Sequence, residues 1–430
     1  MSERVVLKGG TVAGAGGAES RLDVLIEGGR VTAIEPGIGA GDARSIDVAG
    51  KVVMPGFVDV HVHFRQPGRE DKETIQTGSE AALRGGYAAV CPMPNTDPVI
   101  DHRGAVQSVL EEARRVGLVD VLPIGALTKG QQGEELTNFG ELVDAGCVAW
   151  SDDGRPLASS QLMRRALEYS KVFDRPVIQH AEDRALSAGG CVHEGFTATV
   201  LGLRGIPAES ETVIVARDLE LAAMTGGWLH VAHVSCARSV ELIRQAKRRG
   251  VRVTCEVTPH HLTLTDEAIA GFNTDAKMNP PLRTEPDRQA LIEGLRDGTI
   301  DCIATDHAPH TDWEKSADFD SAPFGVIGLE TALGVCATAL VAGGALSWSQ
   351  LAEKLSTNPA RIAGYDGVGL ARGGQANLTF IDPAATWTVD PVAFASKCKR
   401  SPFAGKVLTG RVWGVMRRGA LTRFEGAVPA

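Results

Sequence analysis

The chain has 430 residues, of which 43% are hydrophobic and 23% are charged, and its formal net charge at pH 7 is −9. This length and composition predict a globular protein with one large domain and a smaller accessory domain, not a disordered chain. The negative charge and the lack of a basic patch argue against a nucleic-acid partner, and no apolar run is long enough to span a membrane.

The two ends of the chain share one pattern, short strands separated by glycine turns. Near the start, the strand-like runs are 5–7, 23–26, 31–34 and a further strand pair around Gly50 in 45–53. Near the end, a strand at 376–381 precedes a hairpin at 412–419. These alternations are typical of hairpins. We therefore predict that residues 1–54 and 371–430 together build a small β-sandwich domain.

The segment between them, 55–370, alternates short apolar runs with amphipathic stretches of helical length. Eight runs are strand candidates, namely 56–63, 87–94, 119–127, 147–152, 176–180, 228–233, 251–257 and 302–306. The clearest helical patterns lie at 105–116, 160–173, 210–225 and 239–249. Continuously apolar strands joined by helices indicate a parallel sheet that is buried on both faces. Eight such units predict an α/β fold with a (β/α)₈ TIM-type barrel.

Cysteine usage and the first residues bear on the compartment. The eight cysteines are scattered, and none forms a CxxC pair. We therefore expect the cysteines to be buried free thiols and the protein to lie in a reducing compartment. Because the opening Met-Ser-Glu-Arg lacks the apolar segment of a signal peptide, we predict a cytoplasmic protein.

Polar residues fall at the carboxyl ends of the predicted strands. In a (β/α)₈ barrel these ends converge on one face. His61 and His63 are two residues apart, so both side chains point to the same face of their strand. The full set is His61, His63, Asn95, Asp152, Asp153, His180, His233, Asp306 and His307. Four imidazoles and two or three carboxylates should therefore meet in one pocket, which is a ligand set suited to zinc.

Single polar residues carry much less information. A lone histidine beside an apolar run is usually a hydrogen-bonded structural residue, and we interpret His102, His193 and His230 in this way. Asp59 is interpreted as a supporting or capping residue, and the pair His260–His261 as structural. The polar stretch 312–321 is either a mobile loop over the site or an ordinary surface loop.

The predicted cluster has the residue types that metal-assisted hydrolysis requires. Two neighbouring divalent cations that share a carboxylate can polarise a carbonyl and supply a hydroxide at neutral pH. A separate carboxylate is then needed to take the proton and to deliver it to the leaving nitrogen. Asp306 is placed for this role.

Several motifs resemble one known family. PGFVDVHVH at 55–63 resembles the opening motif of the amidohydrolase superfamily. Together with FRQPG at 64–68, PMPNT at 92–96, SDDG at 151–154 and ATDHAPH at 304–310, it is similar to the class I dihydroorotases. The similarity extends over nearly the whole chain, and the combined set of motifs is highly specific.

The resemblance implies a role for each ligand. His61, His63 and Asp306 would bind a first zinc ion, His180 and His233 a second, and Asp153 would bridge them. Many relatives bridge with a carboxylated lysine, but the corresponding strand end here is Trp150-Ser151-Asp152-Asp153. An aspartate bridge matches the class I enzymes, and because it is shorter, one or two zinc ions per chain are both consistent with it.

The resemblance also implies a substrate site. Arg65, Asn95 and His310 would hold a substrate carboxylate, which suits the two parallel hydrogen bonds of a guanidinium group. Asn279 and the backbone of Phe324 and Gly325 would contact a pyrimidine ring, and His63 would contact the substrate as well as the metal. Asn95 is equally well explained as a turn residue after Pro94.

The activity that the resemblance implies is the reversible cyclisation of N-carbamoyl-L-aspartate to L-dihydroorotate and water, a step of pyrimidine synthesis. One alternative is another cyclic amidohydrolase, namely a dihydropyrimidinase, hydantoinase or allantoinase, but its substrate would lack the ring carboxylate. The other alternative is a non-catalytic dihydroorotase-like partner of aspartate transcarbamoylase, which should lack some of the ligands. A homodimer and a complex of the active enzyme with aspartate transcarbamoylase both stay open.

Overall fold

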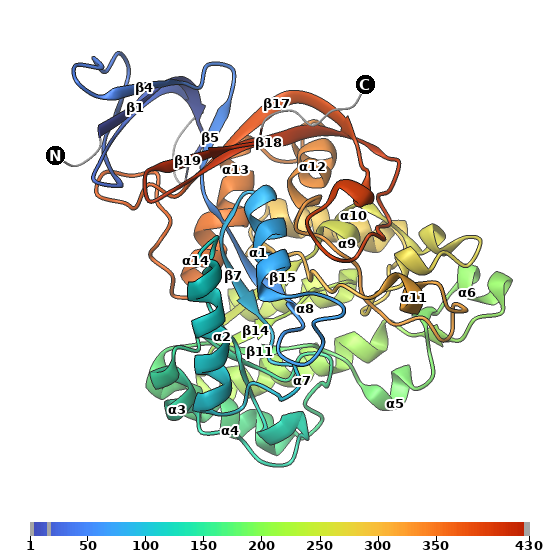
Figure 1. Ribbon diagram of the computed structural model, residues 1–430. Helices are drawn as coiled ribbons and strands as arrows, with labels where there is room; N and C mark the ends of the chain where they lie inside the picture. Colours follow the sequence, from blue (N-terminus) through green and yellow to red (C-terminus); the bar gives the residue numbers. More distant parts are fainter. Residues whose placement is uncertain (1–3, 15–18, 425–430) are drawn as a thin grey trace.

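The computed structural model describes residues 4–14 and 19–424 (Figure 1). Residues 1–3, 15–18 and 425–430, which belong to the predicted segments 1–54 and 371–430, lie outside this description. The first three residues, Met-Ser-Glu, on which the prediction of a cytoplasmic protein partly depends, are among these residues.

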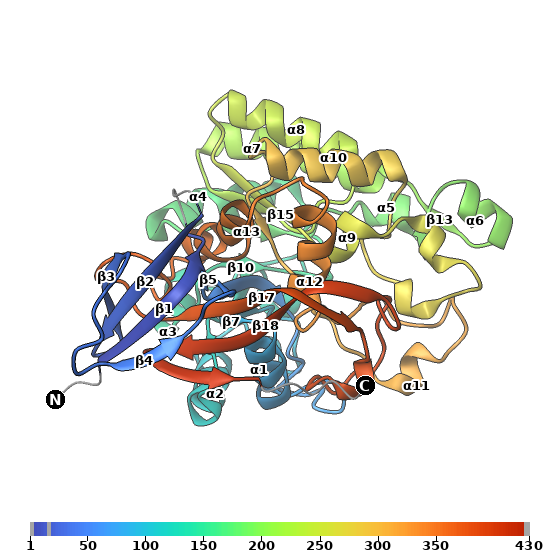
Figure 2. The ribbon, with the colours of Figure 1, turned by 90° about the horizontal axis from the view of Figure 1, so that it is seen from above.

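Strands from both ends of the chain form one eight-stranded sheet, which lies to one side of the molecule (Figures 1 and 2). The order is β19 (Ala420–Arg423), β18 (Val407–Arg417), β17 (Leu378–Thr388), β5 (Val52–Pro55), β1 (Arg4–Val12), β2 (Ser20–Glu27) and β3 (Arg30–Glu35), with β4 (Arg44–Asp47) also paired to β1. Apolar side chains from seven of these strands, including Leu7, Ile26, Ile46 and Phe380, pack in one core cluster. The predicted hairpins at Gly28–Gly29 and before Gly419 are present.

The predicted strand pair around Gly50 is wrong in its pairing. Both strands exist, but β4 and β5 each pair in parallel with β1 and not with each other. β4 pairs with β1 before Gly9 and β5 pairs with it after Gly10, and the register of β1 against β2 shifts between these two parts. A Cβ atom on Gly10 would lie only 2.8 Å from Val53 Cγ2, so this close approach requires glycine.

The segment 57–303 contains two parallel sheets of three or more strands, besides a short two-stranded pair at Val192–His193 and Gly205–Ile206. The first is β6 (Phe57–Val62), β7 (Tyr87–Pro92) and β8 (Asp120–Val121), and the second is β9 (Gly125–Ala126), β10 (Trp150–Ser151), β11 (Val177–Gln179), β14 (Leu229–Val231), β15 (Val253–Val257) and β16 (Cys302–Ile303). The predicted strand 119–127 is divided into β8 and β9 because Pro123 between them has no N–H group to donate. A parallel bridge between Val62 and His307 connects the strand end after β16 to β6.

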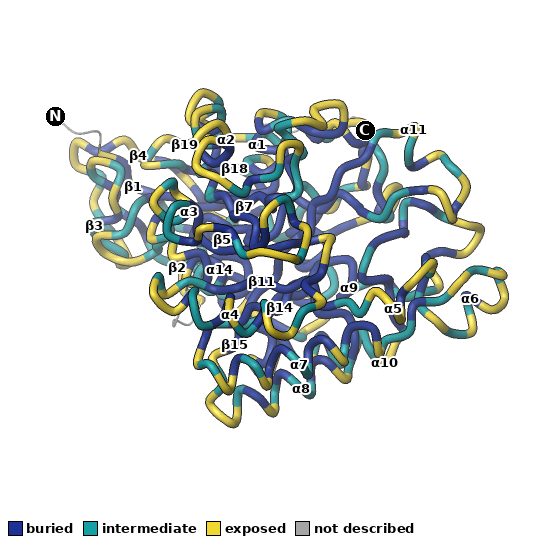
Figure 3. Tube along the Cα trace, turned by 90° about the horizontal axis from the view of Figure 1, so that it is seen from below, coloured by how far each residue is buried: buried dark blue, intermediate teal, exposed yellow. Residues whose placement is uncertain are grey.

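Helices between the strands pack against their neighbours and leave the strands buried (Figures 2 and 3). They are α1 (Ile75–Arg84), α2 (Arg103–Val116), α3 (Phe139–Ala145), α4 (Ser160–Ser170), α7 (Glu209–Thr225), α8 (Ala237–Arg248), α10 (Glu285–Arg296), α12 (Ala332–Cys336), α13 (Trp348–Ala352) and α14 (Asn358–Ile362). Side chains of Thr74, Asn138 and Ser159 cap α1, α3 and α4, which explains where these helices begin. The four predicted helices are confirmed within three residues at each end.

Smaller elements extend from the strand ends. They are α5 (Arg184–Ser187), β12 (Val192–His193), α6 (Phe196–Leu201), β13 (Gly205–Ile206), α9 (Pro259–Thr263) and α11 (Asp312–Lys315). All eight cysteines are buried and free, as predicted. Within the part of the chain that the structure describes, no helix is both long enough and apolar enough to cross a membrane.

Candidate metal centre and active site

The end of strand β6 places His61 and His63 side by side. All six residues of β6 are buried, and the two imidazole rings lie 5.3 Å apart between centroids. Asp59 on the same strand accepts hydrogen bonds from the backbone N–H groups of His61 at 3.1 Å and Thr305 at 3.2 Å. Burial raises the pKa of Asp59 to about 7. Asp59 thus ties β6 to the end of β16, the supporting position that its sequence context predicted.

Asp153 follows strand β10 and contacts all four of the predicted imidazoles. Its Oδ1 atom lies 3.5 Å from His61 Nε2, 3.4 Å from His180 Nδ1 and 3.5 Å from His233 Nε2. Its Oδ2 atom lies 3.4 Å from His63 Nε2. Strand-end position alone did not separate Asp153 from Asp152, and only the family resemblance singled out Asp153. In the structure, Asp152 accepts hydrogen bonds from Leu127 N and Thr128 N instead. Asp153 is therefore the central carboxylate of the cluster.

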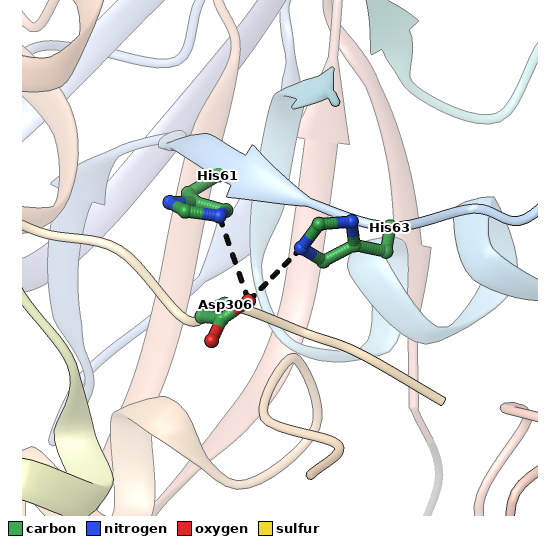
Figure 4. Close-up of side chains that lie close together, drawn as sticks. All are labelled: His61, His63 and Asp306. Atoms are coloured by element: carbon green, nitrogen blue, oxygen red, sulfur yellow. Dashed lines mark hydrogen bonds and ion pairs between the residues drawn. The ribbon is translucent and has the colours of Figure 1, made fainter. Parts of the chain in front are cut away.

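Asp306 approaches the same histidines from the strand end after β16 (Figure 4). Its Oδ1 atom is 3.1 Å from His63 Nε2 and 3.5 Å from His61 Nε2. Its backbone φ is +47°, and that of His233 is +29°. Such left-handed conformations are strained for residues with a side chain and are concentrated at functional sites. Burial raises the pKa of Asp306, but His61 and His63 outweigh it and hold this pKa below its usual value.

The hydrogen bonding of the cluster fits bound cations. Three of its buried atoms have no hydrogen-bond partner among the described residues: His61 Nε2, Asp153 Oδ1 and His180 Nδ1. Buried polar atoms are costly when they are unpaired, so a group of them that faces one point calls for an explanation. Two ligand sets, His61–His63–Asp306 and His61–Asp153–His233, have donor atoms close enough to hold an ion. Imidazole nitrogen and carboxylate oxygen suit zinc, cobalt and manganese.

Glu256 on strand β15 is a buried residue that the sequence analysis missed. Its Oε1 atom accepts a hydrogen bond from His61 Nδ1 at 2.6 Å, and its Oε2 atom lies 3.0 Å from His230 Nε2. Since His61 Nδ1 donates to Glu256, Nε2 is left as the lone-pair nitrogen that faces Asp153. The signal in the sequence was an acidic residue in the apolar run Val253–Val257.

The contacts of Glu256 continue away from the cluster. His230 Nδ1 lies 2.8 Å from Thr254 Oγ1, which accepts a hydrogen bond from Trp228 Nε1 at 3.0 Å. A third group of potential ligands, His230, Glu256 and Cys302, lies in this region. Because both nitrogens of His230 already have partners, we interpret this group as a hydrogen-bond network that orients His61.

Replacing Glu256 with glutamine is expected to weaken metal binding by about 10- to 100-fold, because the neutral amide no longer fixes the ring and the tautomer of His61. Competition with a chromogenic chelator measures this affinity. Glu111→Gln, at an exposed position of α2, is the control and should bind metal like the parent chain. If both variants bound metal with equal affinity, Glu256 would not contribute to metal binding through His61.

Glu182 is a second residue that the sequence analysis missed. Its Oε2 atom lies 3.3 Å from His180 Nε2 and accepts a hydrogen bond from Asn279 Nδ2 at 3.2 Å. Burial raises the pKa of Glu182, but the neighbouring His180 outweighs it and lowers this pKa to about 2. Glu182 thus turns Nδ1 of His180 toward Asp153, and it brings the predicted substrate residue Asn279 to the edge of the cluster.

The predicted carboxylate-binding residues lie on the other side of the cluster. Asn95 Oδ1 is 2.9 Å from His63 Nδ1. Arg65 donates from Nε to the carbonyl of Pro309 at 3.2 Å, and its Nη2 atom lies 3.4 Å from His310 Nε2. The structure therefore brings Arg65, Asn95 and His310 to the neighbourhood of His63.

A buried lysine, not anticipated from the sequence, supports His310. Lys72 Nζ donates to His310 Nδ1 at 3.0 Å and lies 2.8 Å from Glu314. His310 Nε2 donates to the carbonyl of Phe324 at 2.8 Å. Burial and the nearby charges of Arg65 and Lys72 lower the pKa of His310, which keeps the ring neutral. With Nε2 protonated, the N–H of this ring points at the Phe324 carbonyl beside Arg65.

Gly325 sits where only glycine fits. Its φ is +135°, and a Cβ atom would lie 2.7 Å from Ala308 O and 2.9 Å from His310 Nε2. Gly325→Ala is therefore expected to lower the free energy of unfolding by about 1–3 kcal/mol, measured by urea denaturation. Gly271→Ala is the matched control, since Gly271 also has a positive φ but no atom within 4 Å of its Cβ position. Equal losses in the two variants would show that the contacts at Gly325 carry no cost.

The stretch 312–321, for which two interpretations were open, is held by two buried lysines. Lys315 donates to the carbonyls of Lys277, Pro323 and Gly325 at 3.0–3.3 Å. Lys277 donates to the carbonyl of Phe319 at 2.6 Å. These bonds attach α11 and the residues after it to the Phe324–Gly325 backbone.

Other histidines lie outside the cluster. The sequence context indicated this for His102, His193 and His261, but not for His307, which was in the predicted strand-end set. His102 is exposed beside Asp101, and His193 contacts Arg283. His261 Nε2 donates to the carbonyl of Pro280 at 3.0 Å. His307 accepts from the backbone of Gly328 at 3.2 Å and lies 3.4 Å from the buried Glu73, so it points away from Asp153.

Comparison with known proteins places the chain among cyclic amidohydrolases. A dihydro-orotase-like family model matches residues 50–239. A dihydroorotase of Pelotomaculum thermopropionicum is 51% identical over 99% of this chain and 100% of the relative, and one of Anaeromyxobacter dehalogenans is 50% identical over 99% of each. Among solved structures, an L-hydantoinase (dihydropyrimidinase) from Arthrobacter aurescens superposes with a TM-score of 0.87 at 29% identity, covering 100% of this chain and 98% of that one.

Proposed function

The chain belongs to the dihydroorotase family, and on this premise we propose that it interconverts N-carbamoyl-L-aspartate and L-dihydroorotate at the strand-end cluster. Dihydroorotase function and the chemistry of a cyclic amidohydrolase follow from relatives that are matched over their full length. One observation supports the assignment of this activity to the cluster. Four imidazoles converge on Asp153, and several of the buried atoms between them have no hydrogen-bond partner among the described residues.

We assign the metal ligands as the family resemblance implies. His61, His63 and Asp306 would hold one ion, His180 and His233 a second, and Asp153 would be shared between them. Zinc is the proposed metal, because imidazole nitrogen and carboxylate oxygen donors suit it. When bound, such ions polarise a carbonyl and make a water molecule nucleophilic at neutral pH.

The substrate carboxylate is proposed to bind Arg65, Asn95 and His310. Arg65 offers a charged fork, and a substrate carboxylate that took over the His310 N–H from the Phe324 carbonyl would be held by both residues. Asn279 and the Phe324–Gly325 backbone would contact the ring, and His63 would lie between the two groups. Bound in this way, dihydroorotate would have the ring carbonyl next to its C5 atom directed toward Asp153 and Asp306.

Asp306 is the proposed proton carrier. Its Oδ1 atom lies 3.1 Å from His63 Nε2, and an aspartate is ionised at neutral pH, so the carboxylate can accept a proton. In ring opening it takes the proton of the attacking water and delivers it to the leaving ring nitrogen. In ring closure it takes a proton from the ureido nitrogen and delivers it to the departing oxygen.

We propose that the strands of 55–370 close into a (β/α)₈ barrel. The strand order β6 to β16 and the return bridge from His307 to Val62 support closure. The curled sheet from 1–54 and 371–430 would then be the small accessory β domain, for which a sandwich was predicted. A cytoplasmic location, a homodimer and a complex with aspartate transcarbamoylase stay predictions, and size-exclusion chromatography with light scattering tests the dimer.

Removal of metal is expected to abolish ring opening. Dialysis against dipicolinate should reduce activity on L-dihydroorotate to below about 1% of the starting value, because water alone is a poor nucleophile at neutral pH. Adding back Zn²⁺, Co²⁺ or Mn²⁺ should restore it. Protein dialysed without chelator is the control, and full activity in protein shown by mass spectrometry to be metal-free would overturn the proposal.

A further inference from the structure

A cavity lies at the end of the parallel strands opposite to the metal centre. Its volume is about 570 Å³, and its walls come from residues that precede β11, β14 and β15 and from α14. Arg175 stands just before β11, Trp228 just before β14 and Arg252 just before β15. Since His180 and His233 follow the carboxyl ends of β11 and β14, this cavity is separate from the metal centre. It falls within the size range of small-molecule sites.

The cavity is positively charged in a chain whose net charge is −9. Three guanidinium groups line it, from Arg175, Arg252 and Arg361, against the one carboxylate of Asp174. Arg252 pairs with Asp174 at 2.6 Å and stacks 4.6 Å from the centre of the Trp228 ring. The single carboxylate therefore leaves two of the three positive charges without a counter-charge in the cavity wall.

Arg175 is the least satisfied of the three. Its Nε atom is buried and has no hydrogen-bond partner in the described part of the chain. Its Nη1 atom makes only a long contact, 3.4 Å, with the carbonyl of Val148. Arg361 is similarly loosely held, with Nη2 at 3.5 Å from Asn358 Oδ1. Guanidinium groups with free donors in a concave site are the usual partners of phosphate and carboxylate.

The rest of the wall is apolar or aromatic. Phe173, Trp228 and Ile362 contribute to it, together with Val148, Val251 and Val253. This combination of charge and apolar surface fits a molecule that carries both an anionic group and an apolar or ring portion. Inorganic phosphate alone would leave most of the cavity unfilled.

We infer that this cavity is a second binding site, for an organic anion that bears a phosphate or carboxylate group next to a ring. The anionic group would bind between Arg175, Arg252 and Arg361, and the ring would pack on Phe173 and Trp228. The site is distinct from the proposed carboxylate clamp at Arg65, so the two can be tested independently.

Calorimetric titration of the metal-loaded protein with phenyl phosphate, and separately with benzoate, tests the inference. We expect at least one of them to bind the parent chain, and the Arg175→Met/Arg252→Met double variant to lose at least about tenfold in affinity. The ratio of the two affinities tells whether phosphate or carboxylate is preferred. Arg361→Met changes an exposed residue, so it should weaken binding and leave the free energy of unfolding nearly unchanged.

Two controls keep the result unambiguous. Arg296→Met removes an exposed arginine of α10 outside the cavity and should bind the probe unchanged. Arg65→Met should also bind it unchanged, because it alters only the metal end of the strands. Failure of both probes to bind the parent chain at millimolar concentration would overturn the inference. The inference would also be overturned if Arg361→Met and the double variant both bound the probes with parental affinity. Loss of probe binding in Arg65→Met alone would overturn it as well, because the probes would then bind at the metal end of the strands.

Discussion

Asp306→Asn is expected to lower kcat for ring opening of L-dihydroorotate by about 10²- to 10⁴-fold, the usual contribution of a general acid–base group. Asparagine keeps the shape of the side chain and an oxygen that can face His61 and His63, but it cannot accept the proton. Metal content should therefore stay close to that of the parent chain. Steady-state kinetics and mass spectrometry of the same preparation provide both numbers.

The control for this variant is Asp144→Asn, because the Asp144 side chain is 75% exposed at the end of α3 and far from any proposed ligand. It should show parental kcat and metal content. Near-normal turnover in Asp306→Asn with metal bound would remove Asp306 from the proton-transfer role. Loss of turnover together with loss of metal would assign Asp306 to metal binding alone.

Arg65→Met is expected to lower kcat/KM for L-dihydroorotate by about 10²- to 10³-fold. Truncating one partner of a buried charge pair costs about 2–5 kcal/mol, and each 1.4 kcal/mol corresponds to a factor of ten. Metal content should not change, because Arg65 contacts Pro309 and His310 and is not among the proposed ligands. Most of the loss should appear in KM, because the lost contact binds the ring carboxylate in the ground state as well.

Arg69→Met is the matched control, since this arginine is only four residues away but its side chain is 47% exposed and pairs with Asp71. It should leave kcat/KM within about twofold. If Arg65→Met kept the parental kcat/KM, Arg65 would not bind the substrate carboxylate. This result would favour a ring without a carboxylate as the substrate.

The strands and the histidines were predictable because local patterns encode them. A buried parallel strand is a short apolar run, and the polar residue that ends it marks the converging face. The spacing of His61 and His63 required only the two-residue repeat of a strand. The direction in which each carboxylate points was not local information, so strand position alone did not separate Asp152 from Asp153, and the choice of Asp153 came from the family resemblance.

The residues that were missed act across the fold. Glu256 reaches His61 from a strand that is nearly two hundred residues away in sequence, and Lys72 reaches His310 in the same way. Only the order of strands around the site brings these pairs together. The wrong pairing of β4 and β5 has a related cause, because short strands next to each other in sequence usually form hairpins, whereas the glycine bulge in β1 gives both of them a different partner.

The most direct test of the account is turnover of the purified, metal-loaded protein on L-dihydroorotate beside dihydrouracil, hydantoin and allantoin. The account predicts ring opening of L-dihydroorotate at a kcat/KM at least about 10²-fold above that for the uncharged rings, because only this substrate engages Arg65, Asn95 and His310. Preference for an uncharged ring would contradict the substrate site while leaving the metal centre in place. No turnover of any ring, with metal shown to be bound, would contradict the catalytic account and favour a non-catalytic partner of aspartate transcarbamoylase.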